Sequence, residues 1–88
     1  MRFTVVYVKS AQDTLAKLWL DDPDRAAIQQ ATAQIDRELA QAPKLYGTPY
    51  HEGLWTISAG PLTAFYSISE DDRLVEVGGL CLNPRADG

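Results

Sequence analysis

The last third of the sequence, residues 53–82, constrains the fold most, because it contains three β-rich runs separated by tight turns. The first run ends at Gly60 and Pro61, and the second ends at the acidic turn 70–73. Runs of β-branched and aromatic residues bounded by Gly, Pro and Asp are typical of strands, and short turns between them predict antiparallel hairpins. The expected strands are 54–59, 62–68 and 74–82.

Side chains alternate across a strand, so the first two of these strands each have two distinct faces. One face is apolar and is expected to join the core: Trp55, Ile57, Ala59, Leu62, Ala64, Tyr66 and Ile68. The other face carries hydroxyl groups and one aromatic ring: Thr56, Ser58, Thr63, Ser67 and Phe65. This second face bears no charge, and any function placed on it must work with neutral groups.

The first half of the sequence predicts a strand over 3–8, a short helix over 11–20 and a longer helix from Pro23 to Ala42. The strand is rich in β-branched and aromatic residues. The short helix follows a hydroxyl-then-acid pattern from Ser10 to Asp13, which is typical of a helix start. The longer helix ends before Pro43, because the residue preceding a proline is pushed out of helical geometry.

The connection between the two halves, residues 44–53, is polar and contains Gly47 and Pro49, so we expect a loop there. The resulting order is β-α-α-β-β-β in one domain, residues 1–84, with a short tail at 85–88. Two helices that each carry one apolar stripe need a sheet to cover. The sequence therefore predicts an α+β fold with both helices on one face of a mainly antiparallel four-stranded sheet.

Two features of the last strand and the two tryptophans add further expectations. Gly78 and Gly79 have no side chain to pack, which predicts a bulge or the close approach of another backbone. Cys81, between two leucines, is expected to be a small buried hydrophobic side chain rather than a nucleophile. Trp19 and Trp55 are large enough to anchor an interface, but their registers place them with apolar neighbours, which favours core packing.

Composition excludes several function classes. The chain has 88 residues and a net charge of −4, from eight Lys and Arg against twelve Asp and Glu, which argues against free nucleic acid as a partner. A single cysteine excludes an internal disulfide. No apolar run is long enough for a membrane span, and the start does not resemble a signal peptide, so we expect a cytoplasmic protein. The acidic turns lack the ligand spacing of a calcium loop, and no metal or cofactor is expected.

The connection contains the only group with general acid–base potential: Tyr46, Tyr50, His51 and Glu52. An ordinary surface loop is the alternative, since neighbours on an irregular segment need not converge on a substrate. Arg73, Arg85 and Lys44 are possible phosphate contacts or scattered solvated charges. No catalytic residue is therefore assigned, and His51, Arg73 and Arg85 are the candidates.

The element order and the stretch 53–68 resemble the RelE/ParE superfamily of toxins from type II toxin–antitoxin modules, often named plasmid stabilisation proteins. The resemblance covers nearly all of the chain. In the family this stretch typically alternates apolar positions with arginines around a glycine and ends in a tyrosine. The positions that match are Trp55, Ile57, Gly60, Phe65 and Tyr66. The family's arginine positions are occupied by Thr56, Ser58 and Thr63.

The resemblance implies a toxin-like protein that binds a cognate antitoxin. The residues expected to contact this partner are Thr56, Ser58, Thr63, Phe65 and Tyr50. Members that act as ribosome-dependent endoribonucleases use clustered Lys and Arg to stabilise the transition state, and hydroxyl groups cannot supply that charge. The substitutions therefore argue against mRNA interferase activity, and whether the chain is an enzyme stays open; if it is one, a ribosome-dependent endoribonuclease is expected.

Other functions stay open at this point. A toxic member of the family can poison gyrase instead of acting at the ribosome. A degenerate, non-toxic homologue would only bind an antitoxin, and a homodimeric binding module would pair through the neutral strand face. A small-molecule enzyme that uses His51 has the least support, because the sequence has no cofactor motif and no nucleophile at a recognised spacing.

Overall fold

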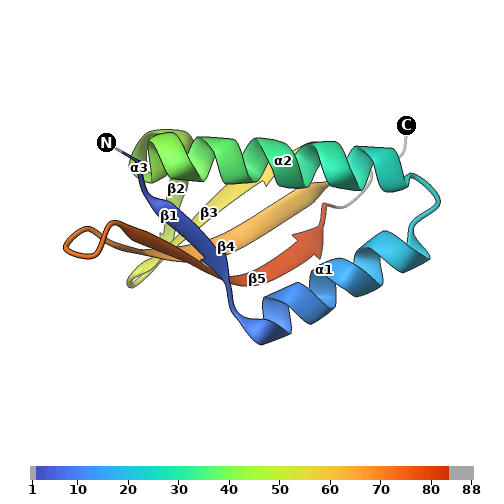
Figure 1. The fold of residues 1–88 in the computed structure, drawn as a ribbon, viewed down its shortest axis with the longest axis horizontal. Coiled ribbons are helices and arrows are strands. Elements are labelled where there is room, and N and C mark those ends of the chain that lie inside the picture. Colours follow the sequence, from blue (N-terminus) through green and yellow to red (C-terminus); the bar gives the residue numbers. More distant parts are fainter. Residues whose placement is uncertain (1, 84–88) are drawn as a thin grey trace.

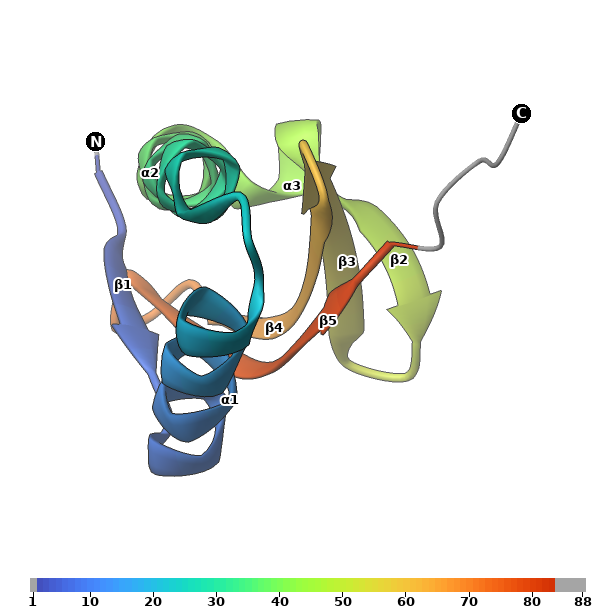
Figure 2. The same ribbon diagram turned by 90° about the vertical axis from the view of Figure 1, so that its right-hand side faces the viewer.

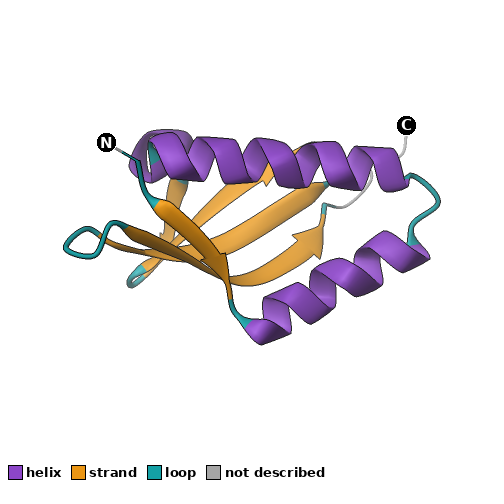
Figure 3. Cartoon of the chain, in the orientation of Figure 1, coloured by secondary structure: helices purple, strands orange, loops and turns teal. Residues whose placement is uncertain are grey.

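The computed structural model describes residues 2–83 of the chain (Figure 1). Its elements, in chain order, are β1 (Thr4–Tyr7), α1 (Lys9–Asp21), α2 (Arg25–Gln41), α3 (Pro43–Tyr46), β2 (Thr48–His51), β3 (Leu54–Ala59), β4 (Leu62–Ser69) and β5 (Leu74–Leu82). The strands form one five-stranded sheet in the order β1-β5-β4-β3-β2. Figure 3 shows the strands in orange and the helices in purple. The first strand pairs with the last in parallel, from Thr4 opposite Leu74 to Tyr7 opposite Val77, and all other neighbours are antiparallel.

Both long helices lie on the same side of the sheet, as Figure 2 shows in end view. The α+β architecture and the placement of the helices confirm the prediction. The expected number of strands was wrong, because the sheet has five strands instead of four. The expected order β-α-α-β-β-β was wrong as well, because α3 and β2 lie between α2 and β3. The expected domain end at residue 84 and the tail at 85–88 lie outside the described residues.

The additional strand comes from the connection that was expected to be a loop. Pro43 begins a single helical turn, α3, where its missing N–H costs nothing. Strand β2 then pairs with β3 and is an edge strand of the sheet formed by the described residues. An edge strand tolerates proline, since one side needs no ladder hydrogen bonds, and this is how β2 accommodates Pro49. The register shifts between Pro49 and His51, so Tyr50 lies at an irregularity in the ladder.

The helix starts differ slightly from the predictions. Helix α1 begins at Lys9, and the preceding Val8 makes no side-chain capping bond, so the expected cap at Ser10 is not used. Helix α2 begins at Arg25, because Asp24 is its N-cap and accepts a hydrogen bond from the amide of Ala27 at 3.1 Å. None of the helices within residues 2–83 combines the length and apolar character needed to cross a bilayer.

The core lies between α2 and the inner face of the sheet. Helix α2 contributes a stripe of fully or nearly fully buried side chains: Ile28, Ala31, Ile35 and Leu39. The sheet contributes Ile57, Ala59, Leu62, Ala64, Tyr66, Val75, Val77 and Leu80. The predicted inward face of the β3–β4 hairpin is therefore confirmed, with Trp55 and Ile68 half-buried at its margin.

A bulge in β5 decides which side chains of this strand face the core. Phe65 pairs with Gly79, but the next residue, Tyr66, pairs with Val77, which leaves Gly78 as an extra residue. The predicted bulge at the glycine pair is thus confirmed. Beyond it the alternation is offset by one residue, so Leu80 points inward. The expectation that Cys81 is buried was wrong, and its thiol is exposed.

Candidate functional site

The side of the sheet turned away from the helices forms a neutral surface, which we call the outer face. Its members come from four neighbouring strands: Tyr50, Thr56, Ser58, Thr63, Phe65 and Cys81. Thr56 lies opposite Phe65, and Ser58 lies opposite Thr63. The ring of Tyr50 packs edge-on against that of Phe65, with centroids 5.3 Å apart. The structure therefore brings all five predicted partner-contacting residues onto one surface.

Two hydroxyl groups of the outer face, those of Ser58 and Thr63, bond each other. Ser58 Oγ and Thr63 Oγ1 are 2.8 Å apart, and Thr63 Oγ1 donates to the side-chain oxygen of Asn83. Because the single hydroxyl proton of Thr63 goes to Asn83, Ser58 is the donor to Thr63. The amide nitrogen of Asn83 donates to the carbonyl of Gly60 at 3.1 Å, which ties the residue after β5 to the β3–β4 turn. The sequence analysis missed Asn83, although its position just after a strand is typical of a side chain that bonds a nearby backbone.

Positive charge is absent from the sheet. No Lys or Arg occurs in any of the strands between residues 4 and 82. Near the margin, Lys44 Nζ lies 2.5 Å from Glu70 Oε2, and this hydrogen bond holds the pKa of the Glu70 carboxyl below its ordinary value. The outer face therefore offers hydroxyls, two aromatic rings and a thiol, but no cation to bind phosphate.

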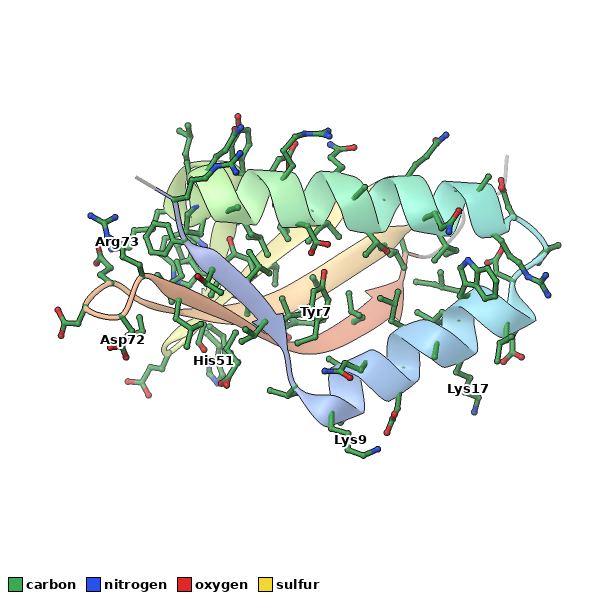
Figure 4. The ribbon with its side chains drawn as sticks, viewed as in Figure 1. Tyr7, Lys9, Lys17, His51, Asp72 and Arg73 are labelled. Atoms are coloured by element: carbon green, nitrogen blue, oxygen red, sulfur yellow. The ribbon has the colours of Figure 1, made fainter. Side chains whose placement is uncertain are left out.

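The catalytic candidates do not converge. His51 lies exposed on β2, where its ring is 6.3 Å from that of Tyr50. The guanidinium of Arg73 lies 5.3 Å from the ring centroid of Phe3, beside β1. Strands β1 and β2 are the opposite edges of the sheet, so these two side chains are far apart in the fold, and Figure 4 shows them pointing in different directions. The third candidate, Arg85, lies outside the described residues. Within residues 2–83, no cluster of side chains could hold a metal ion.

The structure also contains a groove on the helical side, which the sequence analysis did not predict. It lies between α1 and α2, has a volume of about 820 Å³ and is mostly apolar. We call it the α1–α2 groove, and the residues that line it are Tyr7, Gln12, Leu15, Ala16, Trp19, Leu20, Ile28, Gln29, Thr32, Ala33 and Asp36. The two helices approach each other at the 22–24 connection and diverge from there (Figure 1).

One end of the groove presents large apolar side chains to solvent. Trp19 is 36% exposed and Leu20 is 61% exposed. The expectation that Trp19 packs in the core was therefore wrong. It does lie with apolar neighbours, but no further layer covers it. The guanidinium of Arg25 lies 4.9 Å from the Trp19 ring centroid, and its Nε donates to the Trp19 carbonyl at 3.2 Å, so this cation is occupied by the end of α1.

The other end of the groove is polar. The hydroxyl of Tyr7 donates to Asp36 Oδ1 at 2.6 Å, and the side-chain amide of Gln12 donates to the Tyr7 carbonyl at 2.8 Å. Burial raises the pKa of the Tyr7 hydroxyl, and the hydrogen bond to Asp36 and the charge of that carboxylate raise it further. Tyr7 therefore stays a protonated donor, and it holds the carboxylate at the groove wall.

Comparisons with known proteins bear on the fold. No protein-family model matches the chain, and no curated protein matches it. Among solved structures, a chain of the toxin–antitoxin complex RelBE2 from Mycobacterium tuberculosis is similar, with 21% identity and a TM-score of 0.79, over 99% of this chain and 95% of that one. A chain of the archaeal RelE–RelB complex from Pyrococcus horikoshii is also similar, with 17% identity and a TM-score of 0.69, over 98% of this chain and 100% of that one.

These likenesses extend over almost the whole of each chain, so they concern the complete element order and not a shared motif. They agree with the resemblance seen in the stretch 53–68. This chain therefore has the same fold as these two chains from toxin–antitoxin complexes.

Proposed function

We propose that this protein is the toxin-like member of a type II toxin–antitoxin pair, that it binds a cognate antitoxin, and that it lacks mRNA interferase chemistry. The observation that carries the proposal is the full-length likeness to chains from two toxin–antitoxin complexes. The antitoxin partner is inferred for this chain from that likeness.

The α1–α2 groove supports a protein partner. Its apolar walls and the exposed Trp19 and Leu20 are suited to the apolar face of an amphipathic helix. The outer face is the second proposed contact, around Tyr50 and Phe65, where an extended segment of the partner would pack on the two rings. Large aromatic side chains at the centre of an interface commonly contribute much of the binding free energy.

The absence of ribonuclease chemistry is proposed on electrostatic grounds. Phosphate binding relies on Lys and Arg, and preorganised charge at the reacting phosphate is usually the largest catalytic contribution. The three family arginine positions carry Thr56, Ser58 and Thr63, and two of these hydroxyls bond each other. His51 and Arg73 lie at opposite edges of the sheet, so they cannot act together on a phosphate bound at this surface.

Two experiments test the proposal. The protein is co-expressed with the product of the adjacent open reading frame, and a stable complex is expected on size exclusion. It is also expressed alone from a regulated promoter in a bacterial host while growth and total RNA are followed. Codon-associated mRNA cleavage would overturn the claim about chemistry, and failure to form a complex would overturn the claim about the partner.

The neutral outer face favours a second candidate, a non-toxic or degenerate homologue that acts as an antitoxin-binding or homodimeric module. Growth arrest separates a toxin from this module, and a DNA-damage response separates a gyrase poison from both. Sedimentation at several protein concentrations tests the homodimer, because a monomer throughout excludes it.

A further inference from the structure

We infer that Asp36 selects the partner of this protein by pairing with a lysine or arginine on the helix that docks in the α1–α2 groove. The inference rests on the proposed function, because it assigns a chemistry to the segment that occupies this groove. It adds a specificity-determining residue and a charge for the partner, neither of which follows from the fold.

The dimensions of the groove fit a short helix. The residues that line it on α1 run from Gln12 to Leu20 at helical spacing, and those on α2 run from Ile28 to Asp36. On each helix the first and last lining residues are eight positions apart, which corresponds to about 12 Å at 1.5 Å per residue. A docked helix of about two turns fills this length, with apolar residues spaced at i, i+3 or i+4, and i+7.

The groove has two unlike ends because α1 and α2 run in opposite directions. Trp19, Leu20 and Ile28 lie at the end where the helices meet, and Asp36 lies with Gln12 at the other end (Figure 1). A helix with an apolar end and a polar end can therefore dock in only one direction. Asp36 is the only charged residue among those that line the groove in the described part of the chain.

The carboxylate of Asp36 is only partly satisfied within residues 2–83. Its Oδ1 accepts the hydroxyl of Tyr7, and no side chain there donates to Oδ2. No Lys or Arg of the described residues forms an ion pair with Asp36. Lys9 pairs with Asp13 at 3.2 Å, and Arg25 lies over Trp19 at the opposite end of the groove. Lys17 points away from α2 in Figure 4. An incoming partner thus meets a carboxylate with one free oxygen.

The chemistry of the partner follows from what burial does to that carboxylate. A purely apolar helix would remove Asp36 from water and leave it unpaired, which is strongly unfavourable. An acidic helix would add repulsion between like charges. A lysine or arginine opposite Oδ2 would pair with the carboxylate and keep the groove neutral. The net charge of −4 favours the approach of such a basic segment as well.

The test uses the complex with the product of the adjacent open reading frame and compares Asp36→Asn, Asp36→Lys and Asp13→Asn by calorimetry. Asp36→Asn keeps an acceptor for Tyr7 and removes only the charge. We expect it to weaken binding about 10-fold, and Asp36→Lys about 100-fold or more. Asp13→Asn is the matched control, since this exposed carboxylate also lies on a long helix but does not line the groove, and we expect less than about a twofold change.

Charge reversal in the partner sharpens the test. Replacing one lysine or arginine of the bound partner helix with glutamate is expected to restore binding to Asp36→Lys and to weaken binding to the natural protein. Circular dichroism shows whether each variant is folded. If the complex forms and both Asp36 variants bind as tightly as the natural protein, the inference is wrong and the proposed function stands. If the natural protein forms no complex, both are wrong.

Discussion

The outer face and the α1–α2 groove lie on opposite sides of one small sheet and use their polar groups in opposite ways. On the outer face, Ser58, Thr63 and Asn83 form a closed chain of hydrogen bonds that ends on the backbone of the β3–β4 turn. In the groove, Asp36 has one partner and one free oxygen among large apolar side chains. Polar groups that already bond each other, such as these three, gain little from a new polar partner. A surface with uncovered apolar area and a carboxylate without an ion pair gains from both the apolar side chains and the cation of a partner.

The largest expected effect is a loss of stability at Gly47. This residue joins α3 to β2, the strand that places Tyr50 on the outer face. A Cβ atom added there would lie 1.6 Å from the Tyr66 hydroxyl oxygen and 3.0 Å from the Pro43 carbonyl oxygen. Gly47→Ala must therefore displace the buried Tyr66 and is expected to lower the free energy of unfolding by about 3 kcal/mol or more. Urea unfolding measures this.

The control is Gly78→Ala, because a Cβ at the bulge meets no atom within 4 Å. We expect a loss of less than about 1 kcal/mol there. Equal losses of stability in the two variants would show that the close approach of Gly47 to Tyr66 does not determine the position of β2.

The next effect concerns the hydroxyl of Tyr66, which donates to the Pro43 carbonyl at 2.6 Å beneath the outer face. Burial raises the pKa of Tyr66 to about 12. A group whose pKa is higher in the folded state stabilises the fold below its unfolded pKa of about 10, and loses that contribution as the pH rises toward 12. The free energy of unfolding should therefore fall by about 2 to 3 kcal/mol between these pH values.

Tyr66→Phe serves as the matched variant for this pH dependence. It removes one buried hydrogen bond and should cost about 1 to 2 kcal/mol at neutral pH. Its loss of stability at alkaline pH should be smaller than that of the natural protein, although Tyr7, whose pKa is also raised, still contributes. An unchanged alkaline profile in this variant would show that Tyr66 is not the titrating group.

Binding of the partner compares the two surfaces directly. Trp19→Ala removes a half-exposed ring from the groove, and Tyr50→Ala removes an exposed ring from the outer face. We expect Trp19→Ala to weaken the complex by about 2 kcal/mol, as is typical of an aromatic anchor, with a smaller loss for Tyr50→Ala. Calorimetry of both variants measures the two losses of binding free energy. A larger loss for Tyr50→Ala would reverse the ranking and make the outer face the main contact.

The smallest effect is expected at Asn83. Asn83→Ala removes the bonds to Thr63 and to the Gly60 carbonyl at the partly exposed end of the sheet. We expect a loss of about 0.5 to 1 kcal/mol in thermal unfolding, with partner binding unchanged. A change in binding free energy greater than the change in stability would mean that the hydrogen bonds among Ser58, Thr63 and Asn83 take part in recognition.

Much of the fold follows from periodicity in the sequence. The alternation in β3 and β4 identified the buried residues correctly, because each strand has one face on the core. The fifth strand could not be identified in this way. All four of its residues are exposed, so no alternation marks it, and Pro49 suggests a loop unless the strand is known to lie at an edge.

The errors at Cys81 and Trp19 have different physical causes. Cys81 faces outward because one extra residue, Gly78, shifts the alternation, and the glycine pair indicated a bulge without fixing which residue is extra. Trp19 is exposed because the angle between α1 and α2 leaves a groove, and this angle is a property of packing between distant segments. For the same reason, the bond between Tyr7 and Asp36, 29 residues apart, has no local signal in the sequence.

The parallel pairing of β1 with β5 has a consequence for how the protein is made. Within residues 2–83, residues 4–7 have one strand neighbour, residues 74–77, at the opposite end of the described chain. A nascent chain that stops before Leu74 therefore has no place in the sheet for its first strand. Contacts between such distant segments slow folding, because a long stretch of chain must be ordered to form them. The sheet is thus completed only after residues 74–77 have been made, and a partner that recognises the finished sheet meets only chains that extend through β5.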